Sequence, residues 1–191
     1  MPRYLDLLPA LATGKEEVFR LALEGKARPV MLINIAILGT LFGLSNLIGV
    51  IGQAGSEALT GRMLLLLSLL LMLYGIFTMF AVLFGLTLIY WAAAKAFGGP
   101  GGLVLVLELV GLASLPFWLF APLLNYAIRF RPENEVVMSI LLVPLLLSFV
   151  WSSVLIKKSM VAGQGLSEGK ATLAVACMWI FSVSAIYLFS P

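Results

Sequence analysis

A single carboxylate stands inside an otherwise uncharged apolar run, and it is the residue of this chain best suited to chemistry. Glu108 is the only charged residue between Leu103 and Ile128. An ionisable group at membrane depth is a functional-site candidate, because its charge is costly there unless a polar partner or water stabilises it. We therefore predict a candidate functional polar site at Glu108 and Asn34. The alternative is a structural role, in which Glu108 reaches the inner lipid headgroups or takes a polar partner such as Asn34 or Lys95.

Other residue sets do not suggest catalysis. The chain has no histidine, which excludes His-ligated haem or chlorophyll, His acid–base chemistry and most zinc sites. Its one cysteine, Cys177, lies in an apolar run and is interpreted as a small buried hydrophobe. The stretch 163–170 departs from a phosphate-binding loop, because Gln164 stands where a glycine is required and Ala171 follows Lys170. We expect a non-enzymatic protein without catalytic residues, metal or cofactor.

Long apolar runs dominate the rest of the chain and must position these residues. Of the 191 residues, 62% are hydrophobic and 11% charged, whereas a soluble domain carries about 25% charged residues. About 20 apolar residues form a helix that crosses a bilayer, and a helix satisfies its own backbone there. The sequence therefore predicts an all-α membrane protein, a bundle of five transmembrane helices. The spans are expected at about residues 30–51, 63–94, 103–128, 136–156 and 171–190.

The first 29 residues are expected to form a cytoplasmic N-terminal arm preceding a transmembrane domain over residues 30–191. Residues 14–25 predict a short amphipathic interfacial helix, which Thr13 and Glu16 would open as a capping box. Its apolar face, which includes Val18, Phe19 and Leu21, would lie on the inner leaflet or on a partner, and we favour contact with the membrane surface.

The uneven distribution of lysine and arginine predicts how the five spans are oriented. Cations accumulate on the cytoplasmic side of a membrane protein. Five spans place nine cations on the side of the N-terminus and three on the other, which predicts a cytoplasmic N-terminus and an external C-terminus. The first group is Arg3, Lys15, Arg20, Lys26, Arg28, Lys95, Lys157, Lys158 and Lys170, and the second is Arg62, Arg129 and Arg131.

Small residues and prolines predict how the helices pack and bend. Gly39-x-x-x-Gly43 is typical of close helix contacts, and we expect it to pack inside the bundle rather than form a dimer face. Pro116 and Pro122 predict kinks in the third span. The glycine-rich run 98–102 predicts a tight, flexible turn after the second span.

Several short motifs, taken in order, resemble the Yip domain family, which is named for interaction with Ypt/Rab GTPases. They are Gly98-Gly99, the stretch from Gly111 to Pro116, Trp151, and the stretch 165–171, in which Ser167 is the expected N-cap of the last span. The positions carried over by the resemblance are structural ones: Gly98, Gly99, Gly111, Pro116, Trp151, Ser167 and Lys170.

The resemblance to this family implies five membrane helices, a cytoplasmic N-terminus and an external or lumenal C-terminus. Eukaryotic members act in vesicle traffic and bind Rab GTPases and one another. This chain lacks their long cytoplasmic N-terminal region and their acidic-tyrosine motif, and so is similar to the short prokaryotic members. Rab binding is therefore not carried over.

We hypothesise a protein of a prokaryotic plasma membrane that organises or scaffolds other membrane components. Its expected partners are membrane lipids and other membrane proteins or a second copy of itself, and not nucleic acid. A first alternative is an accessory subunit of a large respiratory or photosynthetic complex. A second is a permease for small solutes or lipids, with Glu108 and the kinked third span forming its site.

Overall fold

The computed structural model describes residues 3–54, 61–130 and 135–189, in which the secondary structure is entirely helical. For a few of these residues only the backbone is described: 53, 54, 129, 130, 135, 183 and 185–189. The helices are α1 (Tyr4–Thr13), α2 (Glu16–Leu23), α3 (Arg28–Ala54), α4 (Gly61–Ala96), α5 (Leu103–Leu112), α6 (Phe117–Phe130), α7 (Glu135–Gln164) and α8 (Glu168–Phe189).

Three helices among the described residues are long and apolar enough to cross a membrane. They are residues Arg28–Gly52 of α3, Gly61–Ala96, and Val136–Gln164 of α7, and the bent pair α5–α6 makes a fourth if it is one span. The fifth predicted span corresponds to α8, whose last side chains lie outside the described residues, as do residue 190 and Arg131. The count of five spans and the orientation in the membrane therefore stay predictions.

The third apolar run does not form one helix. α5 and α6 meet at an angle of 78° across the four residues Ala113–Pro116. Pro116 lies at this break, as expected, but Pro122 lies inside α6, which continues past it to Phe130. At about 1.5 Å per residue, the 14 residues of α6 reach about 21 Å, less than the ~30 Å of a hydrocarbon core.

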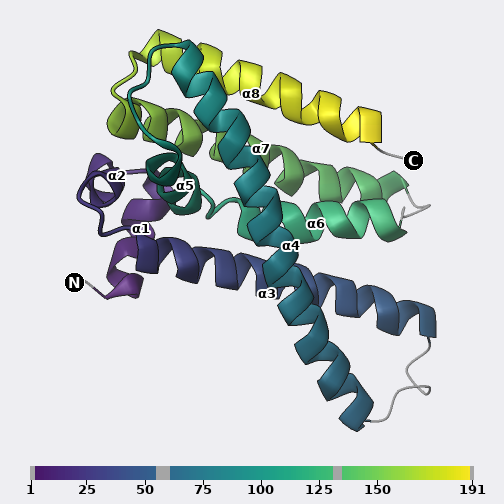
Figure 1. Ribbon diagram of the computed structural model, residues 1–191. Coiled ribbons are helices and arrows are strands. Elements are labelled where there is room, and N and C mark those ends of the chain that lie inside the picture. The colour runs from purple at the N-terminus through teal and green to yellow at the C-terminus, as the bar shows by residue number, and fades with distance from the viewer. Residues whose placement is uncertain (1–2, 55–60, 131–134, 190–191) are drawn as a thin grey trace.

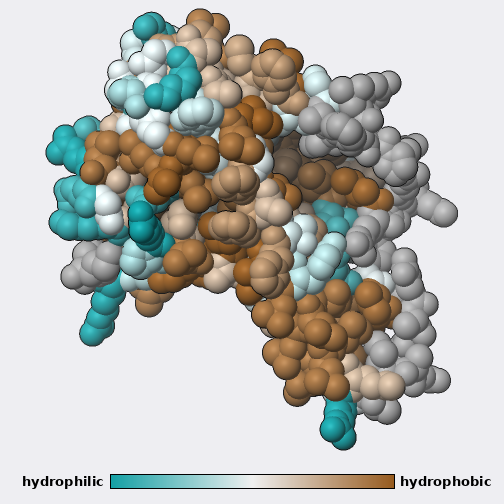
Figure 2. Space-filling model, viewed as in Figure 1, coloured by the Kyte–Doolittle hydropathy of each residue, from teal (hydrophilic) through white to brown (hydrophobic). Residues whose placement is uncertain are grey.

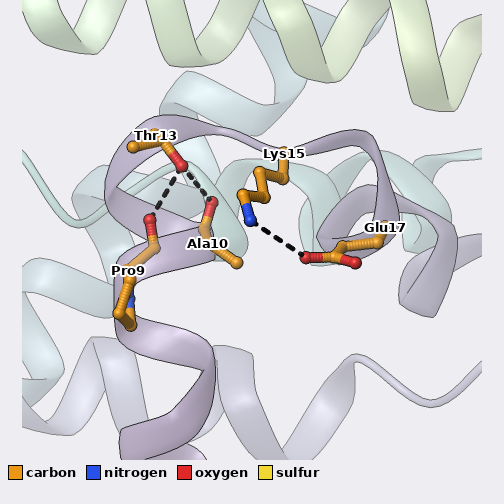
Figure 3. Close-up of polar contacts among 5 residues, drawn as sticks. All are labelled: Pro9, Ala10, Thr13, Lys15 and Glu17. Carbon is orange, nitrogen blue, oxygen red and sulfur yellow. Dashed lines mark hydrogen bonds and ion pairs between the residues drawn. The ribbon is translucent and has the colours of Figure 1, made fainter.

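The N-terminal arm contains two helices, and the capping box predicted between Thr13 and Glu16 is wrong. Thr13 is the last residue of α1, and its hydroxyl donates back to the carbonyls of Pro9 and Ala10 (Figure 3). Gly14 then takes a left-handed conformation, with φ of 62°, which ends α1. Lys15 is the N-cap of α2, and its ammonium pairs with Glu17. α1 was not predicted.

α3, α6, α7 and α8 lie alongside one another, and α4 crosses them obliquely (Figure 1). α3 contacts α6, α6 contacts α7, and α7 contacts α8, while α4 contacts α3, α5 and α8. The short helices α1, α2 and α5 gather at one end of the molecule, and α8 ends at the other. Hydrophilic residues collect at the end that holds α1 and α2, whereas apolar residues cover the flanks (Figure 2).

Glycines bring α3 and α4 into direct backbone contact where they cross. A Cβ added to Gly75 would collide with the Gly39 carbonyl oxygen, and one added to Gly43 would collide with the Leu71 carbonyl. The Gly39-x-x-x-Gly43 pair thus lies against α4 of the same molecule. Such contact matters because lipid tails are as apolar as the helices, so close packing and hydrogen bonds, rather than apolar burial, must join them.

Candidate functional site: a polar strip between α3 and α5

The break between α5 and α6 exposes backbone that Asn34 of α3 satisfies. α5 ends at Leu112, so the carbonyls of its last turn, that of Gly111 among them, have no amide donors further along the helix. The Gly111 carbonyl accepts from the Asn34 side-chain amide at 3.0 Å and from the Ser114 hydroxyl at 2.7 Å. Gly111 is required here, because a Cβ would collide with Met31 of α3. The freed carbonyl is therefore satisfied by protein, as membrane depth demands.

Asn34 joins two further segments at this point. It is fully buried, and its side-chain oxygen accepts a hydrogen bond from the Tyr4 hydroxyl of α1. Its backbone carbonyl accepts from the Trp118 indole N–H of α6 at 3.2 Å. Burial raises the pKa of Tyr4 to about 12, which moves the ionisation of this phenol still further above neutral pH. Asn34 is thus the centre of a hydrogen-bond network linking α1, α3, α5 and α6.

Glu108 pairs with Arg28, and the partners expected for it are wrong. The Arg28 Nε lies 2.9 Å from a Glu108 carboxylate oxygen. Asn34 is committed to Gly111, and the Lys95 ammonium donates to the Pro100 carbonyl at 3.1 Å. Glu108 is 3% exposed, whereas 68% of the Arg28 side chain is exposed. The buried carboxylate is therefore balanced by a cation that reaches the surface.

The N-terminal arm is bound to α7, and the contact expected between α2 and the membrane surface is not found at two of its three residues. Val18 and Phe19 are 0% and 1% exposed within the protein core, and α2 contacts α5 and α7. Leu21 is half-buried and lines a cavity beside α3. The apolar face of α2 thus has a partner inside the same chain.

Two side chains of α7 hold the junction between α1 and α2. The Trp151 indole N–H donates to the Ala12 carbonyl at 2.8 Å, and the Lys158 ammonium donates to the Thr13 carbonyl at 2.7 Å. These carbonyls end α1, where a helix has no internal donors left. Trp151 was expected to close the fourth span, but α7 continues from it to Gln164.

Gln164 fixes the glycine-rich turn, and sequence reasoning missed it. Its side-chain oxygen accepts from the Gly101 N–H at 3.0 Å, and it is 2% exposed. A Cβ on Gly99 or Gly101 would collide with this amide, and Gly98 has a φ of 92°. The turn is therefore packed against α7. The signal in the sequence was the glycine run itself, which we interpreted as flexibility.

The polar strip comprises Arg28 and Asn34 of α3 with Glu108 and Gly111 of α5. The remaining predicted positions lie outside it. Ser167 precedes α8, and its backbone carbonyl accepts from the Ala171 N–H at 2.9 Å. Lys170 is exposed in the first turn of α8. Nearer the opposite end of the molecule, the Asn125 amide of α6 donates to Ser45 and Asn46 of α3 at 3.0 and 3.2 Å. The polar groups of the strip thus bind one another and backbone, an arrangement suited to joining helices.

Long apolar helices, a broken third run and buried polar contacts between helices together define a multi-pass membrane protein of all-α fold. The Yip1 domain family model matches residues 16–189, which is nearly the whole chain. The chain belongs to the Yip1 domain family, which is a family of membrane proteins and is not known as enzymatic. Comparison with curated proteins and with solved structures gives no match.

Proposed function

We propose that this protein organises or scaffolds other membrane components, and that it binds them through the N-terminal half of α4. The observation that carries the proposal is the surface of residues 61–74, which we name the α4 extension. The buried residues of α4 begin at Gly75 and recur every three or four residues to Ala94. In the α4 extension every residue is exposed or half-buried.

The length of α4 supports this role. Its 36 residues reach about 54 Å, well beyond the ~30 Å of a hydrocarbon core. On the N-terminal side of the glycine contacts with α3, α4 projects from the bundle (Figure 1). Figure 2 shows this projecting part as an apolar lobe. Leu65, Leu66 and Leu70 are 61%, 53% and 65% exposed there. A contiguous apolar surface of this kind is suited to another membrane helix.

A site-specific cross-linking experiment tests the proposal in native membranes. A photoreactive amino acid replaces Leu70 of the α4 extension or, as a matched control, Leu147 of α7, which is 66% exposed and also apolar. If the extension binds membrane proteins, Leu70 forms discrete protein adducts at more than about ten times the yield of Leu147. Lipid adducts alone at both positions would contradict the proposal, because the extension would then be a lipid-facing surface.

A further inference from the structure

We propose that the cavity between α1, α2 and the start of α3 binds one phospholipid with a primary ammonium headgroup, such as phosphatidylethanolamine. The cavity has a volume of about 440 Å³, within the range of small-ligand sites. Its walls come from Leu7 of α1, Leu21 of α2, and Val30 and Ile33 of α3. This inference is independent of the α4 extension and goes beyond the proposed scaffolding role.

The depth of the cavity matches the boundary between headgroups and hydrocarbon. The candidate membrane span of α3 begins at Arg28, so Val30 and Ile33 occupy its first two turns. Glu24 and Lys26 line the same cavity but precede the span. The cavity is therefore apolar where acyl chains begin and charged where headgroups lie. Its lipid would continue the apolar flank that the protein already presents to the bilayer.

The charges at the rim select the headgroup. Glu24 and Lys26 form an exposed ion pair at 2.8 Å, so the rim carries one charge of each sign and no net charge. A zwitterionic headgroup matches both charges, with its phosphate on the Lys26 ammonium and its own ammonium on the Glu24 carboxylate. An anionic headgroup would satisfy Lys26 and be repelled by Glu24. A choline headgroup has no N–H to donate to Glu24, so it binds more weakly.

Native mass spectrometry of the full-length protein tests this site directly. The protein is reconstituted in vesicles with equal amounts of phosphatidylethanolamine, phosphatidylcholine and phosphatidylglycerol, then extracted in mild detergent. We expect one retained lipid, with phosphatidylethanolamine at least about fivefold over each of the others, the ratio expected for one additional ionic contact. Equal retention of the three lipids, or a preference for phosphatidylglycerol, would overturn the proposal.

Two variants link any preference to this cavity. Glu24→Gln removes the carboxylate that meets the headgroup ammonium, so the preference for phosphatidylethanolamine over phosphatidylcholine should be lost. Its matched control is Glu17→Gln, which removes the acid of a second pair two residues apart, with Lys15, outside the cavity. Ile33→Trp enlarges a side chain that lines the cavity and should remove the retained lipid altogether. A preference that survives both changes would place the lipid elsewhere and refute the site.

Discussion

Two regions of the molecule are stabilised in lipid in different ways: the end around α5, and the α4 extension. Around α5, side chains from one helix bind backbone or side chains of another: Asn34 binds Gly111, Arg28 binds Glu108 and Trp151 binds Ala12. In the α4 extension, the Ser68 hydroxyl donates to the Leu64 carbonyl of its own helix. The first region is thus held by hydrogen bonds between segments, whereas the second meets α3 at the Leu71–Gly43 backbone contact and has exposed or half-buried side chains along its length.

This difference follows from what stabilises helices in hydrocarbon. Apolar side chains gain little by leaving lipid for protein, so helix positions depend on close packing of small residues and on hydrogen bonds. The C-terminal half of α4 has such contacts, including the hydrogen bond at 2.9 Å between Tyr90 and Ser159 of α7. The α4 extension, on the N-terminal side of Gly75, has large, exposed apolar side chains instead. Apolar surface can be exposed to lipid without a loss of stability, so it remains available to bind a partner protein.

The largest effect is expected at Gly75, where the α4 extension joins the part of α4 that has buried residues. An alanine there would place its Cβ against the Gly39 carbonyl oxygen, and backbone on both sides prevents relief without separating α3 from α4. We expect a loss of about 3 kcal/mol in the free energy of unfolding in detergent, at the upper end for overpacking. In Gly85→Ala of the same helix the added Cβ meets nothing within 4 Å, so thermal stability should not fall. Equal melting temperatures for the two variants would contradict the crossing.

A smaller effect, different for the two partners, is expected for the ion pair between Arg28 and Glu108 near α5. Arg28→Ala leaves the buried Glu108 carboxylate without its cation and should cost about 2 kcal/mol, below the 3–5 typical of fully buried pairs because Arg28 is largely solvated. Glu108→Gln leaves an exposed guanidinium in water, and should cost about 1 kcal/mol. Thermal unfolding of both variants in detergent checks the order. A larger loss for Glu108→Gln would mean that the carboxylate has a role beyond this pair.

The long helices could be predicted from the sequence because a run of apolar residues has one stable form in lipid. α3 and α4 match the predicted spans 30–51 and 63–94 to within two or three residues at each end. α7 was expected to end at residue 156, because paired lysines suit the headgroup layer. In the structure Lys157 pairs with Glu168 and Lys158 binds the Thr13 carbonyl, so protein rather than headgroups satisfies them and the helix continues.

The polar strip could be predicted only in part, because its contacts join residues far apart in the chain. Glu108 and Asn34 were singled out correctly as polar groups inside apolar runs, and both are buried. Their partners were not found, since Arg28 is separated from Glu108 by 80 positions and belongs to a segment expected to lie outside the spans. α1 was missed for a related reason, because Tyr4 and Ala12 are bound by α3 and α7.

A modest effect is expected from Trp151→Phe, which removes one hydrogen bond between α7 and the N-terminal arm. The Ala12 carbonyl loses its indole donor, and the loss in unfolding free energy should be about 1 kcal/mol. Limited trypsin digestion should cut the arm at Lys15 and Arg20 several times faster. Trp91→Phe is the matched control, because its buried indole N–H has no hydrogen-bond partner among the described residues. Faster cleavage in both variants would show a general loosening on loss of a buried indole, and would contradict a specific role of the Trp151–Ala12 hydrogen bond.

The smallest effect on the fold is expected in the α4 extension, and it is the sharpest test of the comparison. Leu70→Ala removes apolar surface that is 65% exposed, so the free energy of unfolding of the isolated protein should change by less than about 0.5 kcal/mol. The same change should lower the yield of protein adducts from a photoreactive residue at Leu66 severalfold, whereas Leu147→Ala on α7 should not. If Leu70→Ala instead destabilises the isolated protein as much as Trp151→Phe does, the extension packs against its own bundle in the membrane. Its exposed surface would then serve folding, and binding of other proteins would have to occur elsewhere.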